Sequence, residues 1–331
     1  MKNKIIFLLV SILFTKESFS TMPFPVENFK WGEVEIISLE GEKTNKDEIL
    51  EGSPLKTLRN KKADENSIEK SFIWCEEKLK QQLNSKIVDC SLEVNRETKI
   101  LNFIISYGNK SDITHQKPEN TNRASLLLEP NLINIENLFS QKFPSLWGSR
   151  REIRETPRES RNGLWVIGYS DKKIDQEALD INGLINPYKN HIFDVILTSN
   201  LEGDVRNAAS LLRWVGLSKE DITYLINNYH NIPPIALNKI SHIFVSFHFL
   251  IDASLENKLF DYSKSLLRSG AYEARENGLN LMAVLLKRNL SLEHHFDSAT
   301  EKYIEYLSNE SMLEKIKVPA KEILSFKNKT S

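Results

Sequence analysis

Histidines, cysteines and carboxylates are the side chains of this chain that could do chemistry, and their spacing favours no catalytic site. His294 and His295 follow Glu293 directly, whereas zinc-binding helices place two ligands at i and i+4 on one face. His242 and His248 are six residues apart, which puts them on different faces of a helix. No glycine-rich phosphate loop occurs in the sequence. We therefore predict no catalytic residue, no metal ligand and no cofactor.

One short motif begins like a nucleophilic serine site. Gly168-Tyr169-Ser170 starts as a nucleophile elbow does, but Lys172 stands where the closing glycine belongs. We reject a serine nucleophile at this position. Carboxylates are scattered along the chain, so a hydrolase site assembled across the fold stays open as an alternative.

The two cysteines, Cys75 and Cys90, lie on faces that should meet. Cys75 shares one face of a predicted helix, capped by Ser67, with apolar residues at three- and four-residue spacing, which are Ile68, Phe72, Leu79 and Leu83. Cys90 alternates with polar residues on one face of a predicted strand. The helix runs about 13 Å past Cys75, and the strand returns about 10 Å to Cys90. We predict a disulfide, with a reduced buried pair as the alternative.

The elements around these cysteines follow the order strand, helix, helix, strand, strand. We expect them at residues 33–39, 46–50, 67–84, 87–94 and 100–107. This order, with Ile37-Ser38-Leu39-Glu40-Gly41 before the first helix, resembles a POTRA domain over residues 30–110. The resemblance implies a periplasmic module that binds other chains by adding a strand to its sheet edge. The alternative is a domain that only caps the rest of the chain.

The middle of the chain, residues 111–172, is predicted to be a linker with a short helix and a charged loop. Residues 109–123 are polar, and an amphipathic helix follows, with Leu132, Ile135, Leu138 and Phe139 on one face. In residues 150–161 arginines and glutamates alternate. Because the two charges cancel, we favour a solvated loop over an anion-binding patch.

Residues 173–326 show the periodicity of paired helices, followed by a polar tail at 327–331. In one helix the apolar face is formed by Val205, Ala208, Ala209, Leu212 and Val215, with Asp204 as its cap and Gly216 as its stop. We also expect Ser218 and Asp221 to form a capping box, and Ser254 to cap a later helix. The second helices of successive pairs begin near residues 204, 233, 271 and 311. This spacing indicates short helical repeats.

The sequence Asp204-Val205-Arg206-Asn207-Ala208-Ala209 resembles the opening of the inner helix in HEAT repeats. The resemblance implies a curved stack of helices whose inner helices form a surface for a partner. Arg213 and Trp214 end this helix, and residues of these types anchor interfaces. The alternative for Trp214 is a half-buried core residue.

The composition and the N-terminus indicate an exported protein. The 331 residues include 44 basic and 45 acidic residues, so no general field attracts nucleic acid or anionic lipid. Lys2 and Lys4, an apolar run at residues 5–14 and small residues up to Ser20 form a signal peptide at residues 1–20. An uncleaved anchor is the alternative, although the run is short for a bilayer. We expect no membrane span after cleavage.

Together these patterns predict an α+β N-terminal domain, similar to POTRA domains, followed by an all-α domain of HEAT-like repeats. We expect a non-enzymatic protein-binding scaffold in the periplasm, with protein partners of the cell envelope on the sheet edge, the concave helical face, or both. The alternatives are a cell-envelope hydrolase and a structural subunit of an envelope complex.

Overall fold

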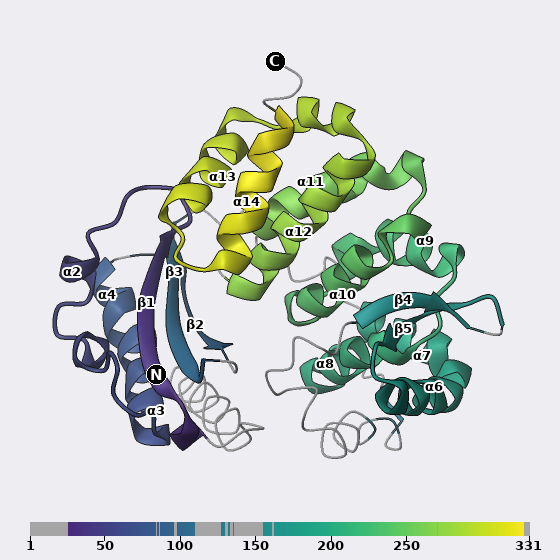
Figure 1. Ribbon diagram of the computed structural model, residues 1–331, viewed down its shortest axis with the longest axis horizontal. Coiled ribbons are helices and arrows are strands. Elements are labelled where there is room, and N and C mark those ends of the chain that lie inside the picture. The colour runs from purple at the N-terminus through teal and green to yellow at the C-terminus, as the bar shows by residue number, and fades with distance from the viewer. Residues whose placement is uncertain are drawn as a thin grey trace, which may run out of the picture. The chain divides into compact units, whose positions relative to one another are not determined.

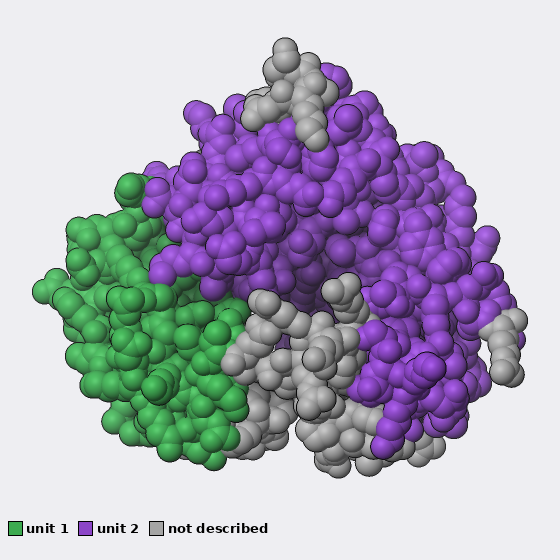
Figure 2. Space-filling model, in the orientation of Figure 1, with its two compact units in different colours: residues 1–38, 43–109 green, residues 39–42, 110–331 purple. Residues whose placement is uncertain are grey.

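The computed structural model describes residues 26–83, 85, 87–95, 98–109, 127–129, 132, 135, 155–160, 162–269 and 271–327. The expected signal peptide, the linker at 111–123, most of the short amphipathic helix and the start of the charged run lie outside these residues. The chain divides into two compact units (Figure 2). Unit 1 comprises residues 1–38 and 43–109, and unit 2 comprises residues 39–42 and 110–331.

Unit 1 contains a three-stranded mixed sheet (Figure 1). Its strands are β1 (Lys30–Ser38), β2 (Ile87–Asn95) and β3 (Ile100–Gly108), in the order β1-β3-β2. The central strand β3 runs parallel to β1 and antiparallel to β2. Alternation in β3 buries Leu101, Phe103 and Ile105 against the helices of this unit.

Three helical segments of unit 1 follow β1. They are α2 (Lys46–Ile49), α3 (Glu65–Ile73) and α4 (Lys80–Leu83), and a π-helical turn at Trp74–Leu79 joins the last two. The predicted cap Ser67 is wrong, because α3 begins at Glu65 and its cap is Asp64, three residues before Ser67. The Asp64 carboxylate accepts from the Ser67 backbone N–H at 2.8 Å, and the Ser67 hydroxyl accepts from the Asp64 N–H at 3.3 Å. Ser67 is therefore the third helical residue of a capping box.

A disulfide joins the helical layer of unit 1 to its sheet. Cys75 in the π-helical turn is bonded to Cys90 in β2, and their Cα atoms are 6.5 Å apart. Cys75 is fully buried, and Ile68 and Leu79 lie beside it in the same core. The face predicted from helical periodicity and the face predicted from strand alternation therefore contact each other at the disulfide.

Unit 2 begins with a hairpin of β4 (Glu155–Glu159) and β5 (Trp165–Tyr169). This part of residues 150–161 is therefore a strand and not the predicted loop, although most of it is exposed to solvent as expected. The Arg158 guanidinium pairs with Asp175 at 2.5 Å, and the backbones of Trp165 and Leu217 exchange two hydrogen bonds of 2.8 Å. These bonds hold charged β4 and apolar β5 on the helices that follow.

The rest of unit 2 is helical. Its helices are α6 (Lys172–Ile185), α7 (Lys189–Thr198), α8 (Glu202–Leu211), α9 (Lys219–Asn227), α10 (Pro234–Ser246), α11 (Glu256–Leu267), α12 (Tyr272–Arg288), α13 (Ser298–Glu310) and α14 (Glu314–Lys327). The predicted capping box of Ser218 and Asp221 is confirmed at the start of α9. Asp204 is not the cap of α8, which begins at Glu202 after Leu201. Ser254 is not a cap either, because it lies inside a 3-10 turn capped by Asp252.

Helices α8, α10, α12 and α14 pack against one another in series, and we call them the inner row (Figure 1). The outer partners α11 and α13 pack against α12 and α14. The described chain is therefore an α+β unit together with a helical unit that includes one hairpin. In the part of the chain that the structure describes, no helix is both long enough and apolar enough to cross a membrane.

Candidate functional site

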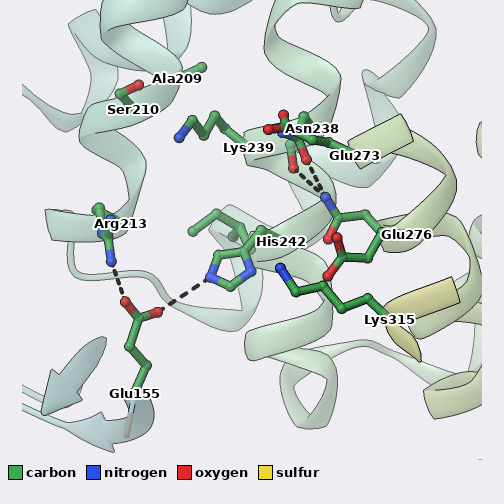
Figure 3. A pocket seen from close by; sticks show the side chains of 12 residues that line it. Glu155, Ala209, Ser210, Arg213, Asn238, Lys239, His242, Glu273, Glu276 and Lys315 are labelled. Carbon is green, nitrogen blue, oxygen red and sulfur yellow. Dashed lines mark hydrogen bonds and ion pairs between the residues drawn. The ribbon is translucent and has the colours of Figure 1, made fainter. Parts of the chain in front are cut away.

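A polar hollow of about 450 Å³ opens on the inner row (Figure 3). Each helix of the inner row contributes side chains to it, and β4 contributes Glu155. We call it the charged hollow, and its polar lining residues are Glu155, Ser210, Arg213, Asn238, Lys239, His242, Glu273, Glu276, Asn277 and Lys315. Basic and acidic side chains therefore meet within one concave surface of unit 2.

Helical spacing explains how these side chains come to share one surface. Asn238 and His242 lie one turn apart on α10, and Glu273 and Asn277 lie one turn apart on α12. The opposite faces of both helices are apolar and buried, as Phe244 on α10 illustrates. Packing of the apolar faces directs the polar faces of adjacent helices into the same space.

Glu155 lies at the centre of one group of contacts in the charged hollow. An Arg213 Nη2 donates to Glu155 Oε1, and the same nitrogen donates to the Tyr169 hydroxyl at 3.0 Å. His242 Nε2 lies 3.5 Å from Glu155 Oε2. The Arg213 guanidinium also lies over the Trp214 ring, 5.0 Å from its centroid. The hairpin thus places a carboxylate between a cation on the turn after α8 and a histidine on α10.

The pKa of Glu155 is lowered by these neighbours. Burial by itself would raise this pKa, but the hydrogen bond with His242 and the charges of Arg213 and His242 outweigh burial. Glu155 is therefore ionised at neutral pH and suits a binding role better than that of a general acid. Such a carboxylate adds stability above the ordinary glutamate pKa, and this contribution is lost as the pH falls through the lowered pKa.

Replacing Arg213 tests this assignment. We expect Arg213→Ala to raise the pKa of Glu155, because the desolvation remains while the guanidinium charge is gone. The measurement is a ¹³C NMR titration of the glutamate carboxyl carbons, with Glu155→Gln identifying the resonance. Arg206→Ala is the matched control, since Arg206 is an exposed residue of α8 outside the charged hollow. An unchanged Glu155 pKa in Arg213→Ala would show that this ion pair does not form.

A second group of contacts joins α10 to α12. The Asn238 amide donates to Glu273 Oε2, and the Asn277 amide donates to Asn238 Oδ1. Asn277 also donates to the Asn238 backbone carbonyl at 3.3 Å. Asn238 is therefore held from both sides, which fixes the spacing of these two helices at the charged hollow.

The residues singled out from the sequence are distributed over both units. Arg213 lines the charged hollow. Trp214 is only 2% exposed, so it packs in the interior and is not an accessible interface anchor. Cys75 and Cys90 form the disulfide of unit 1 and are not part of this site. Among the described residues, no three histidines, cysteines or carboxylates are grouped so as to hold a metal ion.

Most of the charged hollow was missed from the sequence. Glu155 belonged to a run interpreted as a loop, and Lys239, Glu273 and Lys315 look like ordinary solvent-facing residues of separate helices. The available signal was the spacing of polar residues on α10 and α12, because Asn238, His242, Glu273 and Asn277 repeat at one-turn intervals. This periodicity predicts which residues share one face of a helix, but it does not predict which faces of different helices lie together in the fold.

The chain matches no protein-family model, no curated protein and no solved structure.

Proposed function

We propose that this chain is an exported, non-enzymatic scaffold that binds a polar segment of a protein partner along its inner row. The observation that supports the proposal most is the charged hollow, to which four helices packed in series each contribute side chains. Repeats stacked in this way form continuous surfaces suited to extended partners. The resemblance of α8 to HEAT repeats agrees with this arrangement.

The exposure of the lining residues favours binding over catalysis. Lys239, His242, Glu273 and Lys315 are all exposed, whereas catalytic groups act in sites that exclude water. The lowered pKa of Glu155 removes the proton that a general acid would need at neutral pH. The charged hollow is therefore better suited to hold charged groups than to transfer protons.

Export to the periplasm is part of the proposal and rests on two features. One is the expected signal peptide at residues 1–20, and the other is the disulfide of unit 1, which is typical of oxidising compartments. The element order of unit 1 and its resemblance to POTRA domains also fit this location. In the described residues β2 pairs with β3 alone, so its outer edge offers a second surface for a partner.

In-cell photocrosslinking tests the proposed function. A photoreactive amino acid at position 239 should give a crosslink to a defined partner protein, identified by mass spectrometry. The same amino acid at position 302 is the control, because Lys302 is exposed on α13 outside the charged hollow. We expect the position-239 crosslink to fall several-fold when Arg213→Ala and Glu273→Lys are introduced. Equal crosslinks from both positions, insensitive to these substitutions, would contradict the proposal.

The contact of Glu155 with His242 favours one second candidate, a cell-envelope hydrolase. A carboxylate that orients a histidine is part of many general-base sites. This candidate predicts that the purified chain releases soluble fragments from cell-envelope material, and that His242→Ala and Glu155→Gln each abolish the release. Absence of release by the native chain would exclude this candidate for the substrates tested.

A further inference from the structure

The charges of the charged hollow are not equally neutralised. Glu155 is compensated by Arg213 and His242, and Glu276 and Lys315 each have an interaction partner of their own. Lys239 differs from them, since within the described ranges its ammonium group forms no ion pair with a carboxylate. Glu273 contacts the neutral amide of Asn238 and, in the described part, no cation. One unneutralised positive charge and one unneutralised negative charge therefore remain.

These two charges lie in different gaps of the inner row. Lys239 extends from α10 toward Ser210 of α8, away from the pair formed by Asn238 and Glu273 (Figure 3). Glu273 lies where α10 meets α12, beside Asn238. The positive charge thus belongs to the gap between α8 and α10, and the negative charge to the gap between α10 and α12. Ser210, toward which Lys239 extends, adds a hydroxyl to the lining of the charged hollow on the α8 side (Figure 3).

We infer that the charged hollow is a subsite for a dipolar peptide segment, with an acidic side chain bound by Lys239 and a basic side chain bound by Glu273. This inference rests on the proposed function and adds the chemical class of the partner. Ser210 can donate a hydrogen bond to the bound carboxylate, and Glu273 can accept from an ammonium or a guanidinium group. A ligand of a single charge would satisfy one of the two positions and be repelled by the other.

Helix packing sets the spacing of the two charges in the ligand. Axes of adjacent packed helices lie about 8–10 Å apart, so adjacent gaps are separated by about the same distance. Side chains two positions apart share one face of an extended strand and lie about 7 Å apart, and side chains three positions apart share one face of a polyproline II helix and lie about 9 Å apart. The acidic and basic side chains should therefore be two or three positions apart, with the acidic side chain toward α8.

Selection from a random nine-residue peptide library displayed on phage, against the purified full chain, tests the inference. We expect enriched peptides with Asp or Glu two or three positions from Lys or Arg. Lys239→Glu should weaken such peptides about 5- to 10-fold in Kd and shift selection toward basic residues at the acidic position. Glu273→Lys should weaken them similarly and shift selection toward acidic residues at the basic position. Lys302→Glu and Glu69→Lys are controls for the change in charge, because both residues are exposed outside the charged hollow.

The outcomes separate this inference from the proposed function. Enriched peptides without the charge pair, still weakened by Arg213→Ala, would overturn the inference and leave the scaffold function standing. Enriched charge pairs that bind Lys239→Glu and Glu273→Lys as tightly as the native chain would also overturn it. If no peptide is enriched while the position-239 crosslink persists, the partner is not a dipolar segment. Loss of the crosslink as well would overturn both.

Discussion

Removing the disulfide between Cys75 and Cys90 is expected to lower the free energy of unfolding of unit 1 by about 3 kcal/mol, the value of the loop-entropy model for a loop of about 15 residues. The cysteines are 15 positions apart in the sequence and join the helical layer to β2. Without the bond the unfolded chain gains freedom that the folded chain does not. The expected effect is a large fraction of the net stability of a small domain.

Hydrogen exchange measured by mass spectrometry can follow this loss in unit 1 alone. In the Cys75→Ala/Cys90→Ala variant, amides of the central strand β3 should exchange on the order of 100-fold faster where global opening governs exchange. Amides of α12 in unit 2 serve as the internal control. Reduction of the native protein by dithiothreitol should give the same change without altering the packing volume. Unchanged exchange in β3 under both treatments would mean that the bond adds no stability.

Much of unit 1 could be predicted from the sequence because each of its elements has one buried face with a regular period. Ile68 and Cys75 follow the helical period, while Cys90 and Phe103 follow the strand period. A buried face determines which residues of each element point inward. The inward faces of the helix and the strand contact each other at the disulfide. The cap of α3 was misplaced since Ser67 is a good cap by residue type, and only the backbone conformation selects Asp64.

The hairpin in unit 2 was not predicted because neither strand shows the alternation of a half-buried strand. Strand β4 is charged and mostly exposed, and it contains Pro157. Strand β5 is buried on both faces, where Val166 and Ile167 are successive buried residues. The backbone of Trp165 in β5 also pairs with the backbone of Leu217, which lies far away in the sequence. Such a long-range contact has no local sequence pattern.

The charged hollow could not be predicted for a related reason. Each of its side chains is polar at a position where a helix is expected to face solvent, so the residue types alone do not distinguish a binding surface from an ordinary one. Arg213 was selected for its residue type and lies in the charged hollow, whereas Trp214 was selected for the same reason and is buried. The Arg213 guanidinium lies over the ring of the buried Trp214, and only tertiary packing decides which of the two residues is accessible.

Gly278→Ala is expected to lower the free energy of unfolding of unit 2 by about 1–2 kcal/mol, although alanine is the better helix former. An added Cβ at Gly278 would lie 2.9 Å from the backbone oxygen of Ser263 and 3.2 Å from the backbone nitrogen of Leu267. Backbone atoms of α11 cannot rotate away as a side chain can, so α11 and α12 would have to separate. The resulting loss of packing outweighs the gain in helix propensity of about 1 kcal/mol.

A second glycine in a helix of the same unit tests whether close packing makes the Gly278→Ala substitution destabilising. Nothing lies within 4 Å of a Cβ added at Gly183 in α6, so Gly183→Ala should raise stability by about 0.5–1 kcal/mol. Urea unfolding of both variants, followed by circular dichroism of the mainly helical unit 2, should therefore give midpoints displaced in opposite directions. Stabilisation by both substitutions would mean that α11 does not pack closely on α12. Because α12 contributes Glu273, Glu276 and Asn277 to the charged hollow, that result would also remove the support that α11 gives to the proposed binding surface.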